Sequence, residues 1–213
     1  MIFVSPLYVI CDAEVCQRAG WTLVDFASAC LDGGARLMQI RAKGNSSRRL
    51  LDDTLAIVER AATADVQVIV NDRADIARLA GAAGVHLGQE DLSPAAARGI
   101  VGDRSVVGRS THTIDQLHAA LVEPISYVAI GPIFTTSTKA TGYTAVGLER
   151  VAEVAALAAS REIPVVAIGG ITLDRAEHVI ERGAASVAVI SDLLATGDPR
   201  ARVRAFLRRL SRL

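Results

Sequence analysis

The chain has 213 residues, of which 51% are hydrophobic, so it is long enough to bury a sizeable core and falls within the range of one α/β barrel domain. Its 23 Lys and Arg are balanced by 23 Asp and Glu, which gives a formal net charge of zero at pH 7. No overall field therefore favours a polyanion, and a nucleic-acid partner is not expected.

The apolar runs are short and are broken by charged residues or glycine, so none approaches the roughly 20 residues that a membrane-spanning helix requires. Residues 1–11 are apolar but carry no basic leader, which is typical of a first strand. Cys11, Cys16 and Cys30 form no CxxC pair, which favours buried thiols over a disulfide or a metal site. We expect a soluble, cytoplasmic protein without a membrane partner, and the sequence leaves its oligomeric state open, a homo-oligomer included.

Short β-branched runs alternate with helical patterns along the chain. Most of these runs are almost continuously apolar, as strands covered on both faces are. Strict alternation with eight strands favours a single (β/α)8 TIM barrel domain, 1–213, over an open doubly wound sheet, and no GxGxxG motif follows the first strand. The predicted strands span 7–12, 36–41, 67–72, 84–88, 105–110, 127–134, 164–170 and 186–191.

The segments between these strands show the apolar spacing of helices. Ser46 and Thr172 stand where helices should begin, and Gly183 where one should end. In the segment after the second strand, the spacing predicts an apolar face of Leu50, Leu51, Thr54, Leu55 and Val58.

The predicted second strand breaks the apolar pattern. Because successive side chains of a strand face opposite sides, it places Gln39, Arg41 and Lys43 on one face and its apolar residues on the other. Two cations at a barrel mouth are costly to bury unless an anion meets them. The pattern therefore indicates an anion site, with an internal ion-pair network to Asp or Glu as the alternative.

Carboxylates follow the next two strands. The third ends in Asn71-Asp72, and Asp91 follows the fourth. Neighbouring strands lie about 4.8 Å apart, so Asp72 and Asp91 can reach one divalent cation, and two carboxylates that leave the other positions to water and phosphate oxygens suit magnesium. The alternative for Asp72 is a helix N-cap, whereas Ser93-Pro94 already supplies a cap and first turn near Asp91.

The longest connection in the chain follows the sixth strand. Its glycines, its hydroxyls and Lys139 suit a lid over an anion, and a solvated surface loop is the alternative. It lacks the Walker spacing, so a P-loop is excluded.

A second anion site is predicted after the last two strands, which lead into Gly169-Gly170 and Ile190-Ser191. In barrels these two loops, with a helix N-terminus, commonly bind a phosphate through backbone N–H groups. Glycine there lets the oxyanion approach the main chain closely.

Two histidines fall near the predicted rim. His112 follows the fifth strand and is a candidate acid or base. His86 lies inside the fourth strand, where we expect a hydrogen-bonded core residue, and His118 and His178 are expected to be ordinary helical residues.

Together these motifs resemble the thiamine phosphate synthase family along nearly the whole chain. The resemblance rests on segments that match in order and spacing: 39–43 (QIRAK), 71–72 (ND), 84–91 (GVHLGQED), 131–139 (GPIFTTSTK) and 142–143 (GY). Members of that family are (β/α)8 barrels that join a hydroxymethylpyrimidine diphosphate to a thiazole phosphate, releasing diphosphate and forming thiamine phosphate. The resemblance implies the same fold and a transferase that acts on these small molecules.

Carried over residue by residue, the resemblance divides the site into three groups. The pyrimidine diphosphate would be bound by Gln39, Arg41, Lys43, Asn71, Ser110 and Lys139, with Ile40 and Ala42 of the same run counted among the substrate-binding residues. Magnesium would be bound by Asp72 and Asp91. The thiazole phosphate would be bound by Thr136, Ser137, Thr138, Gly170, Ile190 and Ser191. The residues expected to be catalytic are Arg41, Lys43, Lys139 and Ser110.

The reaction of the family is dissociative. The aminopyrimidine ring stabilises a methylene cation, which the thiazole nitrogen then attacks. No protein nucleophile is needed, which fits a sequence without a Ser-His-Asp or Cys-His constellation. Magnesium and the cationic side chains would neutralise the charge that builds on the departing diphosphate.

Two rival interpretations stay open. The nearer one is a thiazole tautomerase of related fold, because 108–112 resembles that group's segment and His112 would carry a proton. Gln39 and Asp91 favour the synthase, since a tautomerase has no diphosphate to ionise. The other rival is a non-catalytic sensor of phosphorylated ligands, which we would expect to lack rim residues that this chain keeps.

Overall fold

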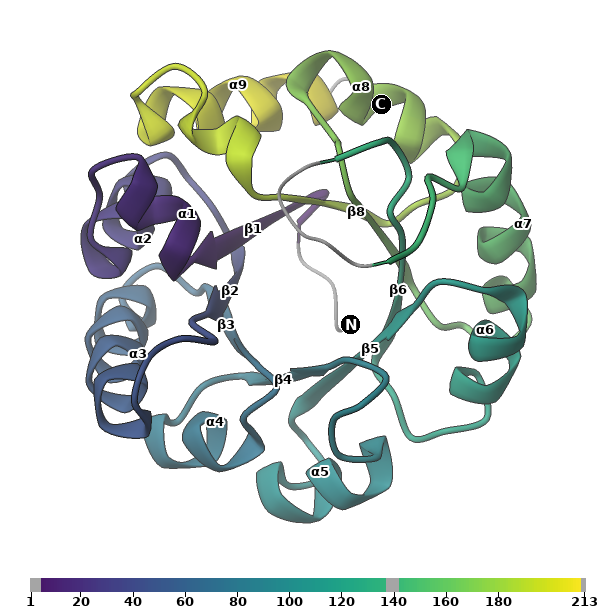
Figure 1. Ribbon diagram of the computed structural model, residues 1–213, viewed down its shortest axis with the longest axis horizontal. Helices are drawn as coiled ribbons and strands as arrows, with labels where there is room; N and C mark the ends of the chain where they lie inside the picture. The colour runs from purple at the N-terminus through teal and green to yellow at the C-terminus, as the bar shows by residue number, and fades with distance from the viewer. Residues whose placement is uncertain (1–4, 137–141, 212–213) are drawn as a thin grey trace.

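The structure is a computed structural model that describes residues 5–136 and 142–211. Within these residues, parallel strands close into a barrel in the cyclic order β1 to β8, with each strand hydrogen-bonded to the next and β8 to β1. Figure 1 looks into the barrel and shows the helices as an outer ring around the strands. The predicted TIM barrel is confirmed.

The elements alternate along the chain as the sequence predicts. The described strands are β1 (Leu7–Asp12), β2 (Leu37–Arg41), β3 (Gln67–Asn71), β4 (Gly84–Leu87), β5 (Val106–Thr111), β6 (Tyr127–Ile130), β7 (Val165–Ile168) and β8 (Ser186–Val189). The described helices are α1 (Ala13–Arg18), α2 (Leu23–Asp32), α3 (Ser47–Ala62), α4 (Ala74–Ala80), α5 (Pro94–Val101), α6 (Ile114–Ala120), α7 (Gly147–Ala159), α8 (Leu173–Glu181), the 3-10 helix η1 (Ser191–Leu194) and α9 (Pro199–Leu210). None of these helices, within the described ranges, is long and apolar enough to cross a bilayer.

Five strands end earlier than the sequence predicts: β3 and β4 by one residue, β7 and β8 by two, and β6 by four. β6 stops at Ile130 instead of residue 134, because Pro132 has no N–H to donate to a ladder. β7 stops at Ile168 instead of residue 170, because Gly169 and Gly170 adopt positive φ values of 103° and 64°. In both places, what looked like strand is loop at the barrel mouth.

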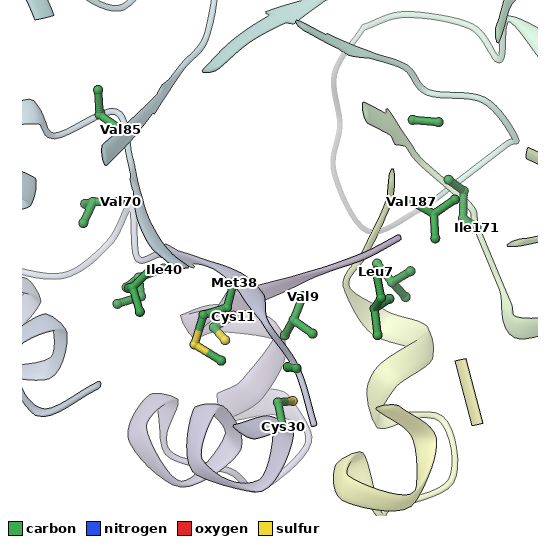
Figure 2. Close-up of a cluster of buried hydrophobic side chains, with 14 of the residues drawn as sticks. Leu7, Val9, Cys11, Cys30, Met38, Ile40, Val70, Val85, Ile171 and Val187 are labelled. Carbon is green, nitrogen blue, oxygen red and sulfur yellow. The ribbon is translucent and has the colours of Figure 1, made fainter. Parts of the chain in front are cut away.

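Alternation along the strands separates two apolar layers. In β1, Tyr8 and Ile10 point into the barrel interior, while Leu7 and Val9 point outward to the helices. Figure 2 shows part of this outer layer, in which β1 and β2 side chains gather with those of neighbouring strands. Both layers consist mainly of hydrophobic side chains.

The predicted apolar face of α3 is partly wrong. Leu50 and Thr54 are buried, but Leu55 is 45% exposed and Ile57 is buried in its place. A helix turns by 3.6 residues, so the positions that follow Leu50 on its buried side are those three, four and seven residues later. Asp53 occupies one of them, and its carboxylate pairs with the side chain of Arg49 at 2.8 Å.

The two predicted helix starts differ in how they are capped. The hydroxyl of Ser46 accepts from the first turn of α3, as expected. Thr172 stands at the N-cap of α8, but among the described contacts its side chain makes no capping bond. The N–H of Leu173 donates instead to Oδ2 of Asp192 at 3.1 Å, which ties the start of α8 to the segment after β8.

The three cysteines all lie within the described residues and are buried free thiols, as predicted. Burial raises the pKa of Cys11, Cys16 and Cys30, so all three stay protonated at neutral pH. They take part in packing and not in chemistry.

Candidate active site

A cavity of about 1020 Å³ opens at the carboxyl ends of the strands, where barrel enzymes carry their active sites. The predicted site residues that line it are Gln39, Arg41, Lys43, Asn71, Asp72, Asp91, Ser110, Thr136, Gly170, Ile190 and Ser191. Ser137, Thr138 and Lys139 lie outside the described residues. In the cyclic strand order β3 stands opposite β7 and β4 opposite β8, so the residues after β3 and β4 face those after β7 and β8 across the cavity, with the end of β2 beside β3.

Two predicted binding residues do not reach the cavity with their side chains. Ile40 and Ala42 are absent from its lining among the described residues. The alternation of β2 turns both side chains into the layer between strands and helices, where they are buried. Any contact with a ligand would therefore involve only their main-chain atoms.

Arg41 is held by an ion pair that the sequence did not reveal. Its Nη1 donates to Oδ2 of Asp12, which is its register partner at the end of β1. The other oxygen of Asp12 accepts from the N–H of Val15 at 3.1 Å and caps α1. Both charged side chains are largely buried, and Nε of Arg41 has no hydrogen-bond partner among the described residues. Arg41 also lines the cavity, so its charge can neutralise that of an anion bound there.

Lys43 forms the second ion pair of the rim. Its Nζ lies 3.0 Å from Oδ2 of Asp72. The ion-pair network considered as an alternative for the second strand is therefore confirmed for both cations. It does not exclude an anion site, because the side chain of Lys43 is 55% exposed and such a pair contributes at most about 1 kcal/mol. Lys43 can thus turn from its carboxylate toward a ligand.

The carboxylates of Asp72 and Asp91 interact at the edge of the cavity. Burial raises the pKa of Asp72, and the adjacent carboxylate of Asp91 raises it further, against the opposing effect of Lys43. The N–H of Gly88 donates to Oδ2 of Asp91 at 2.6 Å and fixes its orientation. A divalent cation between the two carboxylates would relieve their repulsion.

The pair fits magnesium as a ligand set that is completed by other molecules. Within the described residues, no group of three or more His, Cys, Asp or Glu side chains could hold a metal by itself. Magnesium is commonly bound by one or two carboxylates together with water and substrate phosphates. Asp72 and Asp91 would provide the two carboxylates.

Asp72 is not a helix cap. The N-cap position of α4 is taken by Arg73, whose side chain makes no capping bond. Asp72 instead adopts a left-handed φ of 65°. This conformation is energetically unfavourable for any residue other than glycine. Its N–H donates to the carbonyl oxygen of His86 at 2.8 Å, which anchors this turn to β4. The N-cap alternative is therefore wrong.

Glycines build the opposite side of the cavity. Gly170 lies so close to the connection after β6 that a Cβ on it would stand 2.8 Å from Cβ of Phe134 and from the carbonyl oxygen of Thr135. Together with Gly169 it forms a turn that only glycine fits. The main chain here can approach an oxyanion closely, as the sequence predicted for a phosphate site.

Arg175 adds a cation to this side that the sequence analysis missed. It lines the cavity, and its Nη1 donates to the carbonyl oxygen of Gly170 at 3.0 Å. Its guanidinium carbon lies 4.7 Å from the ring centroid of Phe134, in cation–π geometry. An arginine in the first turn of a helix looks like any surface arginine in a sequence, so only the fold reveals its place beside the glycine turn.

His112 lies at the mouth of the cavity, as predicted. Its Nδ1 is 2.5 Å from the carbonyl oxygen of Gly131, and its ring stacks on that of Tyr143 with a centroid distance of 4.0 Å. The side chain of Gln116 binds both His112 and Tyr143. It accepts from the backbone N–H of His112 at 2.8 Å and donates to the Tyr143 hydroxyl at 3.3 Å. A neutral imidazole that donates from Nδ1 to a carbonyl keeps Nε2 as an acceptor.

His86 confirms the prediction of a hydrogen-bonded core residue. It is 8% exposed, and its two ring nitrogens contact the hydroxyls of Tyr127 and Ser110. Tyr8 and Tyr127, which the sequence analysis did not single out, lie beside it in the barrel interior. Both tyrosines occupy inward-facing positions of their strands, so the sequence indicated only that they belong to the core.

Comparison with known proteins points to one family. A sequence profile described as thiamine monophosphate synthase matches residues 7–193. The thiamine-phosphate synthase of Koribacter versatilis is 45% identical over 203 residues, which cover 94% of this chain and 93% of that protein. The thiamine-phosphate synthase of Mycolicibacterium gilvum is 44% identical over 206 residues, which cover 92% of this chain and 84% of that protein.

A solved structure agrees with the sequence comparisons. The thiamine phosphate pyrophosphorylase from Pyrococcus furiosus superposes with a TM-score of 0.86 at 29% identity, covering 97% of this chain and 95% of that one. The family profile spans most of the barrel, and the relatives exceed 40% identity over nearly the full length. The chain therefore belongs to the thiamine monophosphate synthase family.

Proposed function

We propose that the chain is a thiamine-phosphate synthase, which couples a hydroxymethylpyrimidine diphosphate with a thiazole phosphate, or with its carboxylated tautomer, and releases diphosphate. The observation that carries the proposal is the division of one cavity into two halves that suit anions. The carboxylates after β3 and β4, with the cations at the end of β2 beside them, face the glycine turn after β7 and the residues after β8. An isomerase of one phosphate needs one such half, whereas a coupling reaction needs both.

In the first half, Arg41 and Lys43 neutralise charge on the leaving diphosphate. Arg41 lines the cavity and is already oriented by Asp12, so little reorganisation is needed when charge develops. Asp72 and Asp91 would hold a magnesium ion, whose positive charge assists the departure of diphosphate. Lys139, which lies outside the described residues, keeps its predicted role toward the diphosphate.

In the second half, main-chain N–H groups around Gly170 and Ser191 bind the thiazole phosphate, with Arg175 adding positive charge nearby. Thr136 lines the same cavity from the connection after β6. Holding the thiazole nitrogen opposite the pyrimidine methylene supplies the proximity that a dissociative substitution needs. No side chain has to act as a nucleophile.

Incubation of the purified chain with both substrates and magnesium tests the proposal. A synthase forms thiamine phosphate and diphosphate in equal amounts. A tautomerase, for which His112 at the cavity mouth would be the proton carrier, interconverts the thiazole phosphate tautomers and releases no diphosphate. A sensor binds the ligands and forms neither product. Absence of thiamine phosphate and diphosphate at saturating substrate would overturn the proposal.

A further inference from the structure

A row of polar side chains crosses the floor of the cavity. Nε2 of Gln39 donates to the hydroxyl of Tyr8 at 3.0 Å, and that hydroxyl lies 3.0 Å from the hydroxyl of Tyr127. The Tyr127 hydroxyl lies 2.7 Å from Nδ1 of His86, and Nε2 of His86 lies 2.8 Å from Oγ of Ser110. The five residues belong to β2, β1, β6, β4 and β5, so the row joins one wall of the barrel to the other.

The two phenols of this row stand in an apolar interior. Tyr8 and Tyr127 are 1% and 0% exposed among aliphatic side chains. A hydroxyl in such surroundings costs free energy unless it is hydrogen-bonded. Burial also raises the pKa of both phenols well above the ordinary value, so both keep their protons.

The neighbouring strand is shaped to admit Tyr127. Gly108 of β5 is its register partner, and a Cβ on Gly108 would lie 2.1 Å from Cζ of the Tyr127 ring. The ring of Tyr127 stacks on His86 with a centroid distance of 5.5 Å and meets Tyr8 edge-on at 6.0 Å. The position of the hydroxyl is therefore set by packing on several sides.

Gln39 sets the direction of the first hydrogen bond of the row. A carboxamide N–H only donates, so Tyr8 accepts at this end of the row. Hydrogen bonds strengthen one another when they run head to tail, which favours the order from Tyr8 through Tyr127 to Nδ1 of His86. A neutral imidazole that accepts at Nδ1 carries its proton on Nε2 and donates it to Ser110.

We propose that Tyr8, Tyr127 and His86 are positioning residues, which decide the atoms that Gln39 and Ser110 present to the pyrimidine diphosphate. The inference rests on the proposed function, in which these two side chains contact that substrate. The row uses the amide N–H of Gln39 and leaves its carbonyl oxygen to accept. It uses the oxygen of Ser110 and leaves its hydroxyl proton to donate. An acceptor on one wall and a donor on the other suit a ring that carries an amino group and an unprotonated ring nitrogen.

Nitrogen NMR of the four histidines tests the direction of the row. In the wild-type protein we expect His86 to carry its proton on Nε2, with its signals assigned by their loss in His86→Gln. Tyr127→Phe removes only the hydroxyl and should shift the Nδ1 signal of His86. Tyr143→Phe, which alters a tyrosine at the cavity mouth, is the matched control and should leave that signal unchanged. A proton on Nδ1 of wild-type His86 would contradict the proposal.

Kinetics test whether the row acts on the substrate through Ser110. Tyr127→Phe is expected to raise the KM for the pyrimidine diphosphate about tenfold and to leave the KM for the thiazole phosphate within about twofold. In a Ser110→Ala background the same substitution should change the first KM by less than about twofold, since the transmitting hydroxyl is gone.

A purely structural role for the Tyr127 hydroxyl would give different results. It would change both KM values, or its effect would add to that of Ser110→Ala, and either outcome would overturn the proposal. If the wild-type chain formed no thiamine phosphate, the proposed function would fail while the NMR experiment still decided the direction of the row. The two failures are thus distinguishable.

Discussion

Asp91→Ala is expected to lower magnesium-dependent turnover by about 100-fold or more, because it removes one of the two carboxylates that suit the metal. The remaining carboxylate, Asp72, is already paired with Lys43 and is a weak site alone. The measurement is kcat as a function of magnesium concentration. The variant should also need a higher magnesium concentration to reach half of its own maximal rate.

Asp91→Asn is the matched control for this substitution. In the wild-type protein the N–H of Gly88 donates to the carboxylate of Asp91. The amide oxygen of the asparagine can still accept this hydrogen bond, but the negative charge is lost. If the charge holds magnesium, the asparagine variant should resemble the alanine variant. Near wild-type turnover in Asp91→Ala would contradict the metal assignment, and recovery of activity in Asp91→Asn would assign the residue to the local turn.

Arg41→Gln is expected to lower kcat/KM for the pyrimidine diphosphate by about 100-fold to 1000-fold, as loss of a preorganised charge at the leaving group does. It should also destabilise the fold by about 3 kcal/mol, because Asp12 is left buried without its partner. Steady-state kinetics and chemical denaturation measure the two effects separately.

The double variant Asp12→Asn with Arg41→Gln separates stability from catalysis. Removing both charges leaves no unpaired ion, so most of the lost stability should return while the activity stays low. Recovery of activity together with stability would show that Arg41 is needed only for folding. That result would remove it from the diphosphate half.

Strand alternation made much of the site predictable. It assigned Gln39, Arg41 and Lys43 to one face, and the structure puts all three on the cavity. The rule that parallel strands end at one rim likewise brought Asp72 and Asp91 together. These inferences need only local periodicity and the order of elements, which a sequence carries directly.

Pairing across the barrel was not predictable in the same way. The sequence around Asp12 does not indicate that Arg41 is its partner, because the contact depends on the register between β1 and β2. Tyr8 and Tyr127 looked like core residues. Strand alternation shows that a side chain points into the barrel, but it does not show how far along the barrel axis the side chain lies from the ligand cavity. The role of residues 137–139, the cytoplasmic location and the single-domain organisation stay predictions.

The glycine turn offers a selective probe of the second half of the cavity. In Gly170→Ala, a Cβ would press on Phe134 and Thr135 and would also strain a φ of 64°. We expect binding of the thiazole phosphate to weaken about tenfold. Gly102→Ala is the control, because Gly102 has a φ of 91° but nothing within 4 Å of the added methyl group, so it introduces strain away from the cavity.

The central claim is that one cavity holds both anions at once, and calorimetric titration of thiazole phosphate into the protein with saturating magnesium and diphosphate tests it most directly. The two-half cavity predicts that one thiazole phosphate binds per chain while diphosphate stays bound. It further predicts that Gly170→Ala weakens only the thiazole phosphate and Arg41→Gln only the diphosphate. Displacement of one ligand by the other, in direct competition for a single site, would contradict the account.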